Sequence, residues 1–125
     1  MKARFEYVGI RVKDLPESIA FYTRLLGMKV VNRVRIDTTR GEIVNLQSEG
    51  QAFTLELNYY AADSPYNTEY VVGEGLDHLA FRVDDLDAAL AEADRGGHPT
   101  VLRLKADNTR WAYIEDPNGI WIELY

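Results

Sequence analysis

Four side chains capable of chemistry occupy matched positions in the two halves of this 125-residue sequence. Glu56 and Glu123 each lie in the middle of a short run in which apolar and polar residues alternate. Tyr7 and His78 each open another kind of run, which ends in Arg-Val-x-Asp-Leu in both halves. One imidazole and two carboxylates form a ligand set suited to zinc, nickel, manganese or iron(II). We therefore expect Glu56, His78 and Glu123 to bind a divalent metal ion.

The electrostatic cost of bringing two carboxylates together favours this interpretation. At about 4 Å and an effective dielectric constant near 20, two like charges repel by roughly 4 kcal/mol. A bound dication removes that cost, whereas an empty pair must share a proton or find a cation. Arg11 and Arg82 lie on the same strand faces as Tyr7 and His78, but four residues further along, which is about 13 Å. They are better placed to meet an anionic ligand group.

The elements that must position these residues repeat along the chain. Tyr7-Val-Gly-Ile-Arg-Val-Lys-Asp-Leu15 aligns without a gap on His78-Leu-Ala-Phe-Arg-Val-Asp-Asp-Leu86. Phe53-Thr-Leu-Glu-Leu57 likewise aligns on Ile120-Trp-Ile-Glu-Leu124. Period-2 alternation predicts strands, and 3.6-residue spacing after an aspartate predicts capped helices. In the first half we expect strands near 4–13, 28–36, 42–47 and 52–60 and a helix over 14–26; in the second, strands near 76–83, 100–104, 110–115 and 120–125 and a helix over 85–95.

Each half is therefore predicted to be a β-α-β-β-β module. Module one spans about 4–60, module two spans about 76–125, and a turn-rich linker covers 61–75. Polar residues 105–109 predict a loop. A single module is too small to cover both faces of its sheet, so the two must pack as one domain over 1–125.

Composition excludes several classes of function. The chain has no cysteine, which rules out disulfides, thiolate chemistry and sulfur-ligated metal. Its formal net charge of −6 disfavours nucleic acid and anionic membrane as partners. No apolar run approaches the roughly 18 residues of a membrane span, and no signal peptide opens the sequence. A cytoplasmic protein with a small-molecule substrate is the expectation.

Other candidate residues have simpler explanations. Asp14 and Asp85 match between the halves, and helix capping accounts for both. His98 follows the second helix and is assigned to structure or solvent. Trp111, Trp121 and Tyr125 are interpreted as walls of a substrate cavity or as part of an interface, rather than as catalysts.

On these residues the chain resembles the vicinal oxygen chelate superfamily, of the lactoylglutathione lyase (glyoxalase), bleomycin resistance and dioxygenase type. The motifs are Ile10-Arg-Val-Lys-Asp-Leu15, Phe21-Tyr-Thr-Arg-Leu-Leu-Gly27, Asp77-His-Leu-Ala-Phe-Arg-Val83 and Glu115-Asp-Pro-Asn-Gly-Ile-Trp-Ile-Glu123. The resemblance covers almost the whole chain. It implies an α+β fold in which two βαβββ modules pair into an open, barrel-like mixed sheet around a metal.

The resemblance also implies roles for single residues. Glu56, His78 and Glu123 fall on the family's metal-ligand positions, and Arg11 falls where lyase relatives contact the glutathione carboxylate. Tyr7 departs from the pattern, which has histidine or glutamine as its first ligand. Tyr7 either binds metal as a phenolate or lines the cavity and contacts substrate. Tyr60 also replaces a polar residue that helps to hold glutathione in some relatives.

The leading functional hypothesis is a metal-dependent lyase or isomerase that acts on a small α-hydroxycarbonyl compound through a metal-chelated enediolate. Glu56 or Glu123 would carry the proton, as the resemblance to the lyases implies. One alternative is a metal-free small-molecule-binding module of the bleomycin-resistance kind, and another is an iron-dependent dioxygenase. A homodimer is expected, with modules that pair either within one chain or between two.

Overall fold

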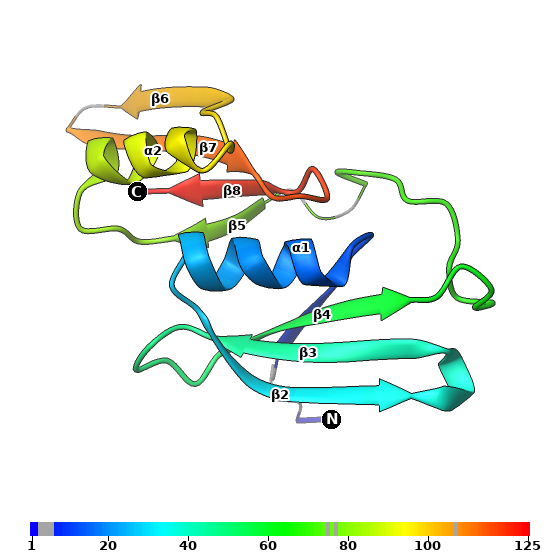
Figure 1. The fold of residues 1–125 in the computed structure, drawn as a ribbon. Helices are drawn as coiled ribbons and strands as arrows, with labels where there is room; N and C mark the ends of the chain where they lie inside the picture. Colours follow the sequence, from blue (N-terminus) through cyan, green and yellow to red (C-terminus); the bar gives the residue numbers. More distant parts are fainter. Residues whose placement is uncertain (3–6, 75, 77, 107) are drawn as a thin grey trace. The chain divides into compact units, whose positions relative to one another are not determined.

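The computed structural model describes residues 1–2, 7–74, 76, 78–106 and 108–125. The chain divides into two compact units, Met1–Tyr70 and Val71–Tyr125. Each unit holds one of the repeated halves, and its described residues form a four-stranded sheet and one α-helix. Figure 1 labels these elements. Parts of the strands predicted near 4–13 and 76–83 lie outside the described residues.

In the first unit a parallel pair joins the two strands that carry the candidate residues. The sheet order is β1-β4-β3-β2, with β1 parallel to β4 and the other neighbours antiparallel. The register places Gly9 opposite Glu56, and Tyr7 opposite Thr54. The elements of this unit are β1 (Tyr7–Arg11), α1 (Leu15–Ala20), β2 (Lys29–Ile36), β3 (Gly41–Gln47) and β4 (Thr54–Tyr60).

The second unit repeats this topology. Its sheet order is β5-β8-β7-β6, with β5 parallel to β8. The register places Ala80 opposite Glu123 on one side and Tyr113 opposite Glu123 on the other. The elements are β5 (His78–Phe81), α2 (Leu86–Arg95), β6 (Leu102–Ala106), β7 (Thr109–Glu115) and β8 (Trp121–Leu124).

Leu55 and Leu57 of β4 and Ile122 and Leu124 of β8 are buried, as the alternating pattern predicts. Leu79 and Phe81 of β5 are only partly buried, and β2 is exposed along most of its length. The α+β class with two β-α-β-β-β units is confirmed. The predicted helix caps are confirmed as well, because Asp14 Oδ1 accepts from Glu17 N at 2.8 Å and Asp85 Oδ1 accepts from Ala88 N at 3.0 Å. The buried apolar residues are Ile10, Val12, Leu15, Phe21, Tyr22, Met28, Val44, Leu46, Leu55 and Leu57 in the first unit, and Leu90, Ala93, Ala112, Tyr113, Ile114, Ile120, Ile122 and Leu124 in the second.

The first helix differs from the prediction in its second half. The α-helical part ends at Ala20, and the chain continues as a π-turn over Phe21–Leu25. Thr23 Oγ1 donates to Ile19 O at 2.7 Å, and a side-chain bond of this kind competes with the regular backbone ladder. The wider turn buries Phe21 and Tyr22 and leaves Leu25 only partly covered.

The loop predicted at 105–109 is also wrong in extent. Strand β6 continues to Ala106 and β7 begins at Thr109, and these two residues pair across the hairpin. Of the predicted loop, Asp107 lies outside the described residues. Polar side chains there mark exposed strand ends, which can pair as well as apolar ones do. Within the described residues, no helix has the length and apolar character needed to cross a membrane.

Candidate metal centre

A tight turn sets the position of the strand that carries Glu123. Asp116 is 4% exposed, and its Oδ1 accepts from the backbone N–H groups of Asn118 and Ile120, both at 2.8 Å. Its Oδ2 accepts from Asn118 Nδ2 at 2.8 Å. Gly119, at φ +85°, closes the turn. Strand β8 then starts at Trp121, with Ile122 and Leu124 buried on the core side and Glu123 on the opposite face.

His78 meets Glu123 across the parallel pair β5–β8. His78 lies opposite Trp121, two positions from Glu123 on the same face. Its Nε2 is 3.4 Å from Glu123 Oε2, and both side chains keep part of their surface exposed. This separation exceeds the roughly 2.7–3.2 Å of a typical N–H···O bond. Two ligand atoms at about 2.1 Å from one tetrahedral ion stand about 3.4 Å apart, so the pair fits a divalent metal.

A third side chain, Tyr113, completes this group. Its hydroxyl donates to Glu123 Oε2 at 2.7 Å, and its ring lies edge-on to His78 with the centroids 5.6 Å apart. Tyr113 is only 8% exposed. The sequence pattern does not single out Tyr113, because its role depends on the β7–β8 register that places it opposite Glu123.

Glu56 occupies the equivalent position in the first unit. It lies in β4 between Gly9 of β1 and Asn45 of β3. Asn58 Nδ2 donates to Glu56 Oε1 at 3.1 Å. Gly9 leaves space here, because a Cβ at that position would lie 3.1 Å from Asn58 Nδ2. Asn45 Oδ1 is buried, and among the described residues it has no hydrogen-bond partner.

Tyr7 and Arg11 share the face of Glu56 but have different surroundings. Tyr7 is 53% exposed. Arg11 Nη1 donates to Thr68 Oγ1 at 2.8 Å, and its Nη2 donates to Glu69 O at 2.7 Å. Its guanidinium also lies over the Tyr70 ring, 5.0 Å from the centroid. The segment that follows β4 therefore fixes the orientation of the Arg11 guanidinium.

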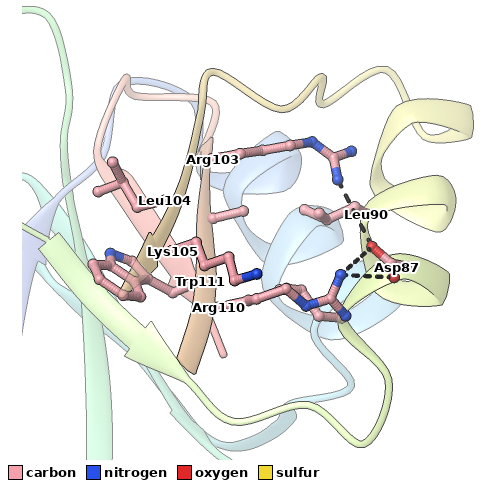
Figure 2. Close-up of a pocket in the computed structure, with 9 residues that line it drawn as sticks. Asp87, Leu90, Arg103, Leu104, Lys105, Arg110 and Trp111 are labelled. Carbon is pink, nitrogen blue, oxygen red and sulfur yellow. Dashed lines mark hydrogen bonds and ion pairs between the residues drawn. The ribbon is translucent and has the colours of Figure 1, made fainter. Parts of the chain in front are cut away.

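The two tryptophans lie on the Glu123 face of the second sheet. Trp121 packs against Tyr113 with centroids 5.1 Å apart, and its Nε1 donates to Glu115 Oε1 at 3.3 Å. Trp111 pairs with Leu104 across β6–β7. Figure 2 shows Trp111 and Leu104 on one side of this hairpin, and Arg103, Arg110 and Asp87 on the other.

The pocket in Figure 2 is formed by α2 and the β6–β7 hairpin, and Leu104 and Trp111 are among its lining residues. Asp87 of α2 lies 3.1 Å from Arg110 Nη1 and 3.8 Å from Arg103 Nη1, and all three side chains are more than half exposed. Leu90 and Ala112 form its floor. These ion pairs link α2 to the β6–β7 hairpin and point to no chemistry.

The structure thus brings His78 and Glu123 together and gives both a neighbour in Tyr113. Glu56, in the first unit, has its own hydrogen-bonded surroundings. In the part of the chain that is described, no three histidine or acidic side chains are clustered closely enough to hold a metal by themselves. The His78–Glu123 pair supplies two of the three predicted ligands, and its spacing suits a divalent metal ion.

Comparison with known proteins identifies the family. A model of the Glyoxalase/Bleomycin resistance protein/Dioxygenase superfamily matches residues 4–124. The chain belongs to this superfamily. Among its relatives, the lactoylglutathione lyase of Pseudomonas aeruginosa is 32% identical over 141 residues, which cover 96% of this chain and 80% of the relative. A probable lactoylglutathione lyase of Vibrio parahaemolyticus is also 32% identical, over 97% of this chain and 88% of its own length.

Solved structures of the superfamily agree with the fold. Glyoxalase I of Leishmania major, described as trypanothione-dependent, superposes with a TM-score of 0.78 at 29% identity. The match covers 98% of this chain and 86% of the Leishmania protein. The suspected relationship to the glyoxalase-type vicinal oxygen chelate proteins is therefore confirmed.

Proposed function

We propose that the chain is a metal-dependent lyase or isomerase of the glyoxalase kind, with Glu56, His78 and Glu123 as its metal ligands. The observation that carries the proposal is the 3.4 Å spacing of His78 Nε2 and Glu123 Oε2. The internal repeat supports adding Glu56, because it occupies the same strand position as Glu123 in the other unit. Zinc, nickel, manganese and iron(II) all suit a ligand set of one imidazole and two carboxylates.

The substrate class follows from the relatives and from the charges near the site. Lactoylglutathione lyases are named for a thioester of glutathione, and we propose a small α-hydroxycarbonyl substrate of that type. A divalent ion bound at the three ligands would supply Lewis-acid stabilisation for charge that develops on two neighbouring substrate oxygens. Arg11, oriented by Thr68 and Glu69, would bind a substrate carboxylate.

One of the two ligand carboxylates would also transfer the proton. Glu56 or Glu123 would take a proton from one substrate carbon and return it to the next, within hydrogen-bond reach of both. Tyr7, half exposed on the Glu56 face, would line the site and donate to substrate. Trp111 and Trp121 would exclude water from the Glu123 side.

The test combines metal removal with an activity assay. The chain is dialysed against a chelator, and its thermal stability is measured before and after zinc, nickel or manganese is added. The proposal expects a lower melting temperature without metal and its recovery with metal, since an ion that binds only the folded state stabilises it. It also expects lactoylglutathione to form from methylglyoxal and glutathione only in the reloaded protein. A metal-bound protein with no activity on thiol adducts would contradict the substrate class.

Two observations favour a second function, a metal-free binding module. Tyr7 stands where a first metal ligand is expected, and the Glu123 face carries Trp121 stacked on Tyr113. Aromatic walls of this kind suit the capture of a small apolar ligand. The melting temperature of such a module should not change when the protein is dialysed against the chelator.

We further propose a homodimer, and the ligand set allows its pairing to be tested. Glu56 belongs to one unit, and His78 and Glu123 belong to the other. If units of two chains share a site, mixing Glu56→Ala chains with Glu123→Ala chains creates one intact site in each mixed dimer. Recovered metal binding after mixing would indicate pairing between chains, and no recovery would indicate pairing within a chain.

A further inference from the structure

The hydroxyl of Tyr113 is the feature of the second unit that the proposed metal site leaves unexplained. It donates to Glu123 Oε2 at 2.7 Å, a length typical of an O–H bond to a carboxylate. The same oxygen faces His78 Nε2 at 3.4 Å. One oxygen of the proposed ligand Glu123 therefore accepts a hydrogen bond from a phenol on one side and faces the imidazole of His78 on another.

The surroundings of Tyr113 hold this phenol rigidly. The residue lies in β7, directly opposite Glu123, between Ala112 and Ile114, which are both buried. Its ring contacts His78 edge-on at 5.6 Å and Trp121 at 5.1 Å. Trp121 is in turn tied to Glu115 by its indole N–H. A ring packed between two others has little freedom to move its hydroxyl away from Glu123.

The equivalent place in the first unit is filled differently. The strand partner of Glu56 in β3 is Asn45, whose buried Oδ1 has no hydrogen-bond partner among the described residues. Glu56 instead accepts a longer bond, 3.1 Å, from Asn58. The two carboxylates are thus matched in the repeat but are not held alike: Glu123 accepts from the phenol of its strand partner Tyr113, whereas the strand partner of Glu56 is Asn45.

We propose that Tyr113 is a positioning residue that sets the metal affinity of the His78–Glu123 pair. This inference rests on the proposed metal site. The hydroxyl occupies one lone-pair direction of Glu123 Oε2 and thereby fixes the carboxylate plane, which leaves the remaining directions free for an ion. Partners of this kind beyond the ligands typically change metal affinity by about 10–100-fold when removed.

The test compares metal affinity in Tyr113→Phe and in the wild type. The dissociation constant for Zn²⁺ is measured by competition with a chromophoric chelator, and for Co²⁺ by the visible absorption of the bound ion. Tyr113→Phe should bind both ions about 10–100-fold more weakly and change the Co²⁺ spectrum. Its metal-free melting temperature should stay close to that of the wild type. Tyr59→Phe, a strand tyrosine on the opposite face of β4 from Glu56, is the matched control and should bind as the wild type does.

A double-mutant cycle separates positioning from a general effect on the fold. In a Glu123→Gln background, the further change Tyr113→Phe should cost no more affinity, because the carboxylate that it orients is gone. Equal affinity of wild type and Tyr113→Phe, or an additive loss in the double variant, would overturn the proposal. A wild type that binds no metal would instead overturn the proposed function.

If the Tyr113→Phe variant does not fold, the proposal is tested by NMR on the wild type. With ¹³C-labelled tyrosine, the Tyr113 ring signals should shift when Zn²⁺ binds to the wild type and should stay in place in Glu123→Gln. If the Tyr113 ring signals of the wild type do not shift when Zn²⁺ is added, the positioning role is wrong.

Discussion

The substitution Asp116→Ala tests how the chain builds the turn ahead of Glu123. The Asp116 carboxylate is 4% exposed and accepts three hydrogen bonds of 2.8 Å, two from backbone N–H groups and one from the Asn118 amide. Alanine removes both acceptor oxygens, and the three donor groups in this buried turn lose their bonds to the carboxylate. Hydrogen bonds to a charged group contribute about 1.5–3 kcal/mol each, and the losses do not add fully. We expect the free energy of unfolding to fall by about 3–5 kcal/mol.

Asp87→Ala is the matched control. Asp87 also contacts two partners, Arg103 and Arg110, but its side chain is 61% exposed. Exposed ion pairs contribute about 0–1 kcal/mol, so this variant should lose no more than that. Both variants remove one carboxylate, but Asp116 is buried among uncharged N–H donors, whereas Asp87 is exposed beside two guanidinium groups. The comparison therefore sets a buried, hydrogen-bonded carboxylate against an exposed, ion-paired one.

The assay is urea unfolding of both variants and the wild type, followed by tryptophan fluorescence, in chelator so that metal binding does not contribute. The reasoning would be refuted if Asp116→Ala lowered the free energy of unfolding by less than about 1 kcal/mol. A loss no larger than that of Asp87→Ala would refute it as well. It would mean that water replaces the carboxylate in the turn.

Two further predictions concern Glu56 and an exposed ion pair. In Gly9→Ala the new Cβ would lie 3.1 Å from Asn58 Nδ2 and displace that amide from Glu56. Metal affinity should therefore fall about tenfold, with little change in the free energy of unfolding. Unchanged affinity in a metal titration would contradict this prediction. The hydrogen bond from Arg33, and then its charge, hold the pKa of the Glu42 carboxyl below its ordinary value. The pair therefore stabilises the fold above the unfolded pKa of about 4.3 and loses this effect as the pH falls through the lower folded pKa. Glu42→Gln should lower the free energy of unfolding by less than about 1 kcal/mol at pH 7. In urea titrations, the difference between the wild type and the variant should become smaller as the pH falls. A difference that does not change with pH would contradict this prediction.

The repeat made the strands and helices of both units predictable. Asp14 and Asp85 are followed by apolar residues at helical spacing, and both cap helices as expected. Alternation around Glu56 and Glu123 correctly placed both on the face away from the buried leucines and isoleucines. Local periodicity is sufficient for such assignments because it depends only on neighbouring residues.

The features that sequence reasoning missed depend on side-chain bonds between elements or within one turn. The π-turn at Phe21–Leu25 accompanies the bond from Thr23 to Ile19 O, and periodicity does not reveal it. Tyr113 reads as an ordinary strand residue until the β7–β8 register places it opposite Glu123. Arg11 could be placed on the right face, but its contacts with Thr68 and Glu69 depend on the path of the segment after β4.

The most direct test of the central claim is the metal content of the purified chain, prepared without a histidine tag and loaded with zinc. Elemental analysis should find about one ion per chain in the wild type, and far less in each of Glu56→Ala, His78→Ala and Glu123→Ala. Full occupancy in Glu123→Ala, or a wild type that retains no metal after loading, would contradict a site built from these three residues.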